Sequence, residues 1–87
     1  MKEITNMMLL NEEYDMEILK HNINKLDLFT VMNTQILTAK FCIDVILNEE
    51  YQITSEEKTI DIYDILNRQP HIKKEDLIKI MHGIKLP

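Results

Sequence analysis

The sequence has few of the residues that break helices or build catalytic loops. Its 87 residues include 1 Gly, 2 Pro, 1 Cys and no Trp. Because Gly83 is the only glycine, a glycine-rich phosphate-binding loop is excluded. The lone Cys42 cannot form an intramolecular disulfide, which is typical of a reducing compartment, and we therefore expect a cytoplasmic protein.

Positive charge is also scarce. Ten Lys+Arg against fifteen Asp+Glu give a net charge of -5, and a single arginine, Arg68, is present. A negative net charge does not favour binding to the negatively charged phosphates of nucleic acid, so nucleic acid is a disfavoured partner. The most apolar stretch, 28–47, has the length of a membrane span but includes Lys40 and Asp44, and charges at mid-bilayer are costly. We expect no membrane span.

The chain is rich in hydrophobic residues, most of them aliphatic. Hydrophobic residues make up 45% of the chain, enough for one small core, and the length allows a single domain over 1–87. Ile, Lys and Asn are abundant and Lys greatly outnumbers Arg, a bias typical of AT-rich genomes such as those of many phages.

Capping signals divide the chain into helices. Thr5 caps a predicted short helix at 5–10, and Asn11 precedes a predicted helix at 12–25 whose first turn carries Glu12 and Glu13. Asp27 opens the longest predicted helix, 28–48. One face of that helix carries apolar residues at helical spacing: Phe29, Met32, Ile36, Ala39, Ile43 and Ile46.

Two further helices are predicted in the last third. Thr54 and Glu57 form a capping-box pattern, although the alternation in 59–63 also fits a short strand. Pro70 ends this helix, and a last helix begins after Lys73 and stops near Gly83, with Ile84 folding back on it. We predict an all-α bundle of four or five helices around the central helix at about 28–48.

Residues suited to catalysis or metal binding do not form sets. Cys42 lies in the most apolar segment, where burial raises a thiol pKa and lowers its reactivity. His71 and Glu75 are four apart, but no second pair completes a tetrahedral metal site. We therefore expect no enzymatic activity, no cofactor and no metal.

Residues 59–82 can also be interpreted as a helix-turn-helix, with Lys73, Lys74 and Lys79 on its second helix. Glu75 and Asp76 lie on the same helix, and arginine for base recognition is nearly absent. A DNA-binding regulator is therefore the alternative function.

The favoured function is a non-enzymatic protein-protein interaction module, in the form of a small regulator or inhibitor from a phage or other mobile element. One short helix cannot bury the whole run from Met7 to Leu10 against a small core, and Met is common at binding surfaces. The predicted partner-binding residues are Met7, Met8, Leu9, Leu10, Phe29 and Met32. We expect another protein as partner and self-association as a homodimer; the competing interpretation is that these residues belong to the core.

Overall fold

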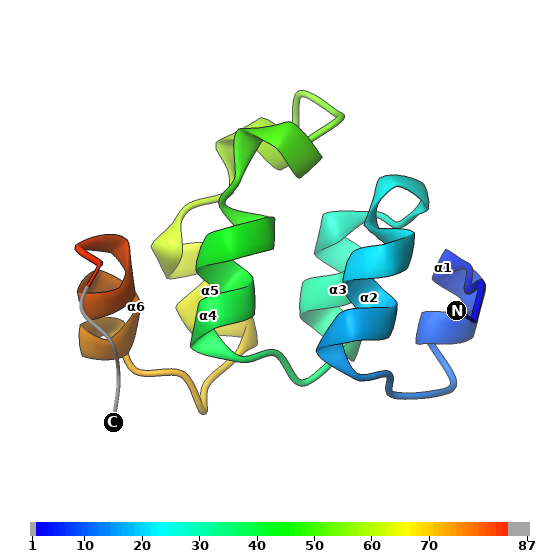
Figure 1. Ribbon diagram of the computed structural model, residues 1–87, viewed down its shortest axis with the longest axis horizontal. Helices are drawn as coiled ribbons and strands as arrows, with labels where there is room; N and C mark the ends of the chain where they lie inside the picture. The colour runs from blue at the N-terminus through cyan, green and yellow to red at the C-terminus, as the bar shows by residue number, and fades with distance from the viewer. Residues whose placement is uncertain (1, 84–87) are drawn as a thin grey trace.

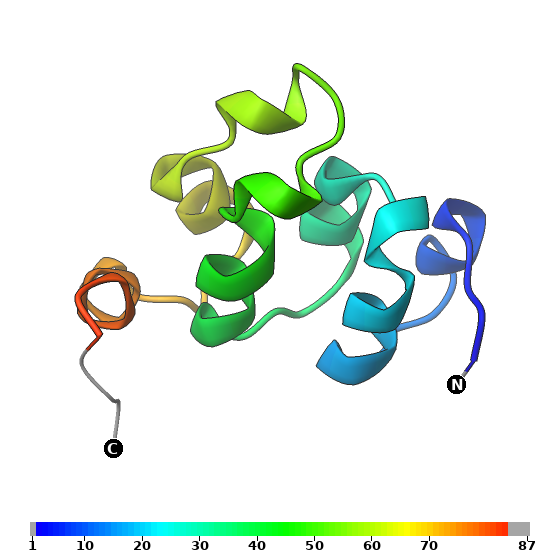
Figure 2. The same ribbon diagram turned by 45° about the horizontal axis from the view of Figure 1, so that its top comes forward.

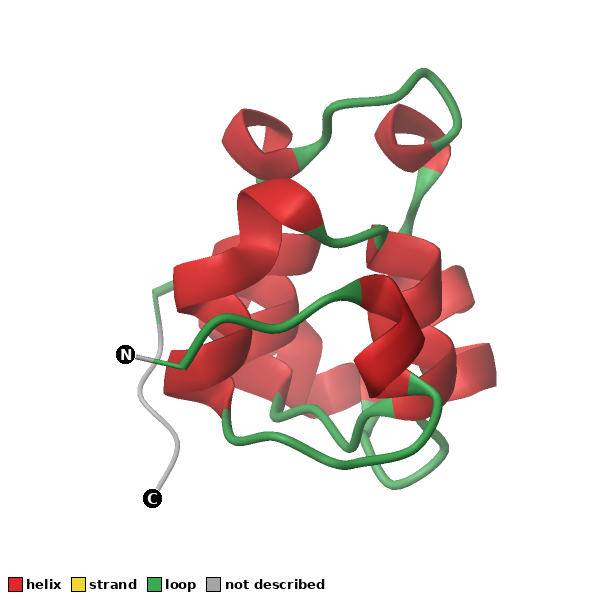
Figure 3. Cartoon of the chain, turned by 90° about the vertical axis from the view of Figure 1, so that its right-hand side faces the viewer, coloured by secondary structure: helices red, strands yellow, loops and turns green. Residues whose placement is uncertain are grey.

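The computed structural model describes residues 2–83 and confirms the all-α prediction. Residues 2–83 contain six α-helices, whose arrangement can be followed in Figure 1, and Figure 3 shows only helices and loops over the described residues. The helices are α1 (Asn6–Leu9), α2 (Met16–Asn22), α3 (Leu28–Thr34), α4 (Ala39–Phe41), α5 (Ile62–Arg68) and α6 (Lys74–Met81). A π-helical segment, Cys42–Ile46, continues α4, and short 3-10 turns occupy Ile23–Lys25, Glu49–Tyr51 and Glu57–Thr59.

The helices form two groups along the longest axis of the molecule, as Figures 1 and 2 show. The N-terminal half contains α1, α2 and α3, and the C-terminal half contains α4, α5 and α6. Helix α1 packs on α3, α6 packs on α4, and α3 meets α5 between the halves. The link between the halves is the segment 35–38.

Side-chain caps start the first four helices. Thr5, Asp15, Asp27 and Thr38 each accept the backbone N–H three residues ahead, at distances of 3.4, 2.9, 3.2 and 3.1 Å. Each bond satisfies a donor that has no partner inside the helix. The predicted caps at Thr5 and Asp27 are confirmed.

The prediction of one helix over 28–48 is wrong. Helix α3 ends at Thr34, Gln35 is extended with φ -111° and ψ 151°, and Thr38 caps a new helix. The apolar stripe is split accordingly, and Ile36 is 62% exposed although it lies in the middle of the pattern. Splitting this helix raises the number of helices above the predicted four or five.

The break is held by Gln69, the C-cap residue of α5. Its side-chain Nε2 donates to the carbonyl oxygens of Met32 and Gln35 at 2.7 and 2.6 Å, and its Oε1 accepts from the Leu37 N–H at 2.8 Å. A continuous helix would bond these same three backbone groups internally. Gln69 thus replaces the hydrogen bonds that the break removes.

Two other predicted starts are corrected. The helix expected at 12–25 begins at Met16, because Asp15 takes the cap position. Thr54 and Glu57 do form the predicted capping box, with bonds of 3.1 and 3.0 Å, but it opens only the 3-10 turn. Helix α5 starts later, at a second capping box formed by Asp61 and Asp64.

The end of α5 and both ends of α6 follow the prediction. Helix α5 stops two residues before Pro70, and α6 begins after Lys73. Gly83 has φ +77°, the left-handed conformation typical of a helix C-terminus. The predicted contact of Ile84 lies outside the described residues.

Candidate functional site

The predicted partner-binding run divides between the surface and the core. Met7 on α1 and Leu10, the residue that caps its C-terminus, are 74% and 67% exposed, while Met8 is half-buried against the core. Leu9 is only 2% exposed. A four-residue helix turns through little more than one turn, so its consecutive side chains face different directions. Two side chains of the run are available to a partner, and Leu9 is a core residue.

The two predicted residues of α3 belong to the interior. Met32 is completely buried in the core cluster. Phe29 is half-buried between the halves, where the Arg68 guanidinium lies 5.5 Å from its ring centroid. In this structure, Leu9 and Met32 present almost no side-chain surface with which to contact a partner.

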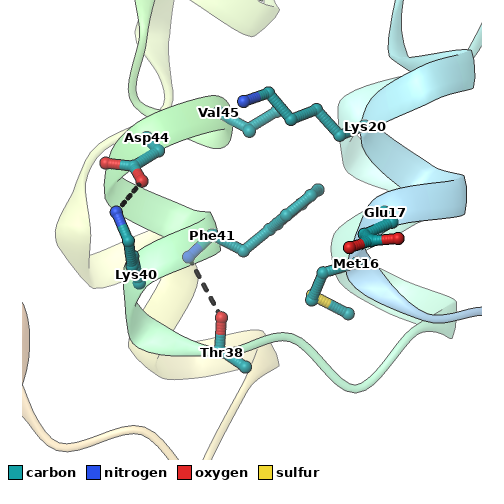
Figure 4. A pocket seen from close by; sticks show the side chains of 8 residues that line it. All are labelled: Met16, Glu17, Lys20, Thr38, Lys40, Phe41, Asp44 and Val45. Carbon is teal, nitrogen blue, oxygen red and sulfur yellow. Dashed lines mark hydrogen bonds and ion pairs between the residues drawn. The ribbon is translucent and has the colours of Figure 1, made fainter.

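A groove lies between α2 and the segment formed by α4 and the π-helix, as Figure 4 shows. Its floor is apolar and consists of Met16 from α2 and Phe41 and Val45 from the other wall. The Phe41 ring points across the groove toward α2. The remaining lining residues are Glu17, Lys20, Thr38, Lys40 and Asp44.

Local irregularity shapes one wall of the groove. Thr38 caps α4 by accepting the Phe41 N–H at 3.1 Å, and this bond fixes the first turn. The helix then widens, with the Leu47 N–H bonded to the Cys42 carbonyl at 2.9 Å, a five-residue step. Single π-turns inside helices are frequent at functional sites. The π-helical segment contributes Val45 to the floor and Asp44 to the rim.

The rim of the groove is charged on both sides. On one wall, Lys40 of α4 and Asp44 of the π-helical segment form an ion pair about one helical turn apart. On α2, Glu17 and Lys20 are exposed, and neither makes an ion pair within residues 2–83. The α2 rim therefore offers both a carboxylate and an ammonium group to a bound molecule.

The size of the groove limits what it can hold. Its volume is about 190 Å³, below the roughly 300–1,000 Å³ typical of sites for small molecules. An apolar floor of this size is suited to one large aliphatic or aromatic side chain. Buried apolar anchors of this kind dominate many protein-protein interfaces.

The groups most capable of chemistry are engaged in structure. Burial raises the pKa of the Cys42 thiol to about 12, which suppresses the reactive thiolate. The buried Glu57 carboxylate accepts the N–H groups of Leu28, Ile53 and Thr54 at 2.8 to 3.0 Å. The His71 ring nitrogen lies 2.6 Å from the Leu37 carbonyl oxygen. Within residues 2–83, no three His, Cys, Asp or Glu side chains converge on a possible metal position.

Sequence reasoning missed the groove. Met16 and Phe41 are far apart in the chain, and each reads as an ordinary residue of an apolar helical stripe. The only local signal was Thr38, a cap residue inside a segment with helical periodicity.

Comparison of the chain with protein families, curated proteins and solved structures finds no match. None of the helices described for residues 2–83 is long and apolar enough to cross a membrane.

Proposed function

We propose that the protein is a non-enzymatic protein-binding module whose α2–α4 groove receives one apolar side chain of a partner. The observation that carries this proposal is the apolar floor of Met16, Phe41 and Val45 beneath a charged rim. The proposed setting is the cytoplasm, because the only cysteine is reduced and buried. A small regulator or inhibitor from a phage or other mobile element is the form we favour.

The partner segment we propose is basic beside its apolar anchor. The chain carries a net charge of -5, which attracts cationic partners and speeds their association. At the groove itself, Glu17 is exposed and has no ion-pair partner within residues 2–83. The exposed Glu13 and Asp15 lie just before it in the chain. A Lys or Arg near the anchor would pair with Glu17.

Selection from a library of random displayed peptides tests this proposal. We expect the selected peptides to share one Leu, Phe or Met followed or preceded closely by Lys or Arg. Glu17→Gln should weaken their binding by up to about fivefold, since exposed ion pairs contribute about 0.2–1 kcal/mol. Glu13→Gln is the matched control, because it makes the same change of charge on the exposed loop before α2. Equal affinities of the two variants would contradict the proposed site.

DNA binding remains the alternative function. Helices α5 and α6 contact each other, and Lys73, Lys74 and Lys79 are exposed. Lys74 is already engaged, however, since its ammonium lies 5.1 Å from the Tyr63 ring centroid and 3.3 Å from the hydroxyl. A DNA-binding protein would bind a duplex with an affinity that falls steeply as salt rises. If the protein binds DNA in this way and Lys73→Glu abolishes the binding, the DNA-binding function would be favoured over the proposed protein-binding function.

A further inference from the structure

We propose that the segment 35–38 is a hinge through which two copies of the chain exchange halves to form a swapped dimer. In that dimer, residues 28–46 would form one continuous helix, and the N-terminal half of each copy would pack on the C-terminal half of the other. The partner is thus a second copy of this chain, and the interface is the one already present between the halves. This inference is independent of the proposed function.

The hinge sequence itself favours a helix. Residues 35–38, Gln-Ile-Leu-Thr, contain neither Gly nor Pro, and the apolar pattern continues across them at helical spacing. A continuous helix of 19 residues would extend about 28 Å and place α3 and α4 end to end, so the present packing of the two halves could not form within one chain. The exposed Ile36 would return to the apolar stripe.

The hydrogen bonds at the hinge can be satisfied in either arrangement. In the closed chain, Gln69 bonds the Met32 and Gln35 carbonyls and the Leu37 N–H. In a continuous helix, the carbonyls would accept from residues 36 and 39, and the Leu37 N–H would donate to residue 33. The three backbone groups that Gln69 pairs in the closed chain are therefore also paired in a continuous helix, whereas the Gln69 side chain gives up these three bonds.

The contacts between the halves that lie outside the hinge would be retained on swapping. They include the Glu57 carboxylate on the Leu28 N–H at 2.9 Å and the Arg68 guanidinium over the Phe29 ring. Each joins an N-terminal residue to a C-terminal one, so each can form equally between two copies. The two states therefore differ mainly in the hinge, a situation that makes swapping a low-cost route to dimers. The α2–α4 groove would then be shared between copies, since its walls come from different halves.

Hinge variants of the full chain test this inference by sedimentation. Thr38→Ala removes the exposed cap of α4 and adds a strong helix former. A cap changes the equilibrium between the closed and open hinge by roughly a factor of five. A swapped dimer opens two hinges, one in each copy, so the substitution should raise the dimer association constant about twenty-five-fold. Gln69→Leu should also raise the dimer association constant. It leaves the Met32 and Gln35 carbonyls and the Leu37 N–H unpaired in the closed chain, whereas a continuous helix pairs all three internally. Samples are first held near the unfolding midpoint in urea, so that the halves can separate.

Ile36→Pro is the matched blocking variant. Proline fits the closed hinge, because Gln35 before it is extended and the Ile36 N–H makes no hydrogen bond within residues 2–83. It is incompatible with a continuous helix. We expect Thr38→Ala to dimerise and the combined Thr38→Ala, Ile36→Pro chain to stay monomeric.

Two results would overturn the inference. The first is that the Thr38→Ala variant has the same dimer association constant as the wild type. The second is a dimer that survives Ile36→Pro but is lost in Met7→Ser, Leu10→Ser, which would place the contact on the exposed face of α1.

Discussion

The side-chain nitrogen of Gln69 lies 2.6 Å from the carbonyl oxygen of Gln35, 34 positions earlier in the chain. This contact joins the end of α5 to the break between α3 and α4. Gln35 in turn accepts the Tyr14 N–H at 2.8 Å and donates to the Glu12 carbonyl at 2.9 Å. Two buried glutamines thus connect three loops at one end of the bundle.

Gln69→Leu should lower the free energy of unfolding by about 3 kcal/mol, because three buried backbone groups lose their partner. Gln52→Leu is the matched control: Gln52 is also buried, but within residues 2–83 its side chain makes a single hydrogen bond, to the Ile46 carbonyl at 2.9 Å. We expect that change to lower stability by about 1 kcal/mol. Urea unfolding of dilute monomeric protein measures both values, and equal losses would contradict the special role of Gln69.

On α1, Leu9→Ala should lower the free energy of unfolding by about 2–5 kcal/mol, the usual range for a buried leucine. Met7→Ala should change it by less than about 0.5 kcal/mol, as expected for an exposed side chain. Leu9 and Met7 are 2% and 74% exposed, and they lie two positions apart. Thermal or urea unfolding gives both numbers. A large loss on Met7→Ala would mean that this side chain belongs to the core.

Alkaline pH should destabilise the fold through Cys42. Burial raises the pKa of its thiol from the ordinary 9.0 to about 12, so the folded chain keeps a proton that the unfolded chain releases. Stability contributed by the neutral thiol is therefore complete below pH 9.0 and is lost as pH rises toward about 12. The slope from this group is about 1.4 kcal/mol per pH unit.

Comparing wild type with Cys42→Ala at pH 8 and pH 10 isolates this contribution, since the other titrating groups are common to both chains. We expect the wild type to lose more stability than the variant over this interval. Parallel losses would show that the thiol ionises as easily in the folded chain as in the unfolded one.

The parts of the fold that depend on neighbouring residues were predictable from the sequence. Thr5, Asp27 and the Thr54–Glu57 pair act on backbone groups within three positions, and Gly83 adopts its positive φ locally. Such signals can be recognised without knowing the tertiary structure.

The parts that depend on distant residues were not predictable. The apolar spacing in 28–48 favours one helix, and the break is stabilised because Gln69, at the end of another helix, bonds the three buried backbone groups that the break leaves without a helical partner. The candidate groove has the same character, since Met16 and Phe41 meet only after α2 and α4 have packed. The spacing of apolar residues in the sequence does not show which of them will line a groove in the folded protein.

The central claim, that the groove receives one apolar side chain, is tested most directly by NMR titration of the ¹⁵N-labelled protein. The titrant is N-acetyl-phenylalanine amide, with N-acetyl-alanine amide as the control that is too small to fill the groove. We predict saturable shifts of the amide signals of Glu17, Lys20, Phe41 and Val45 with the phenylalanine compound and much weaker ones with alanine. Shifts confined to α1 or α6, or equal responses to the two compounds, would contradict the claim.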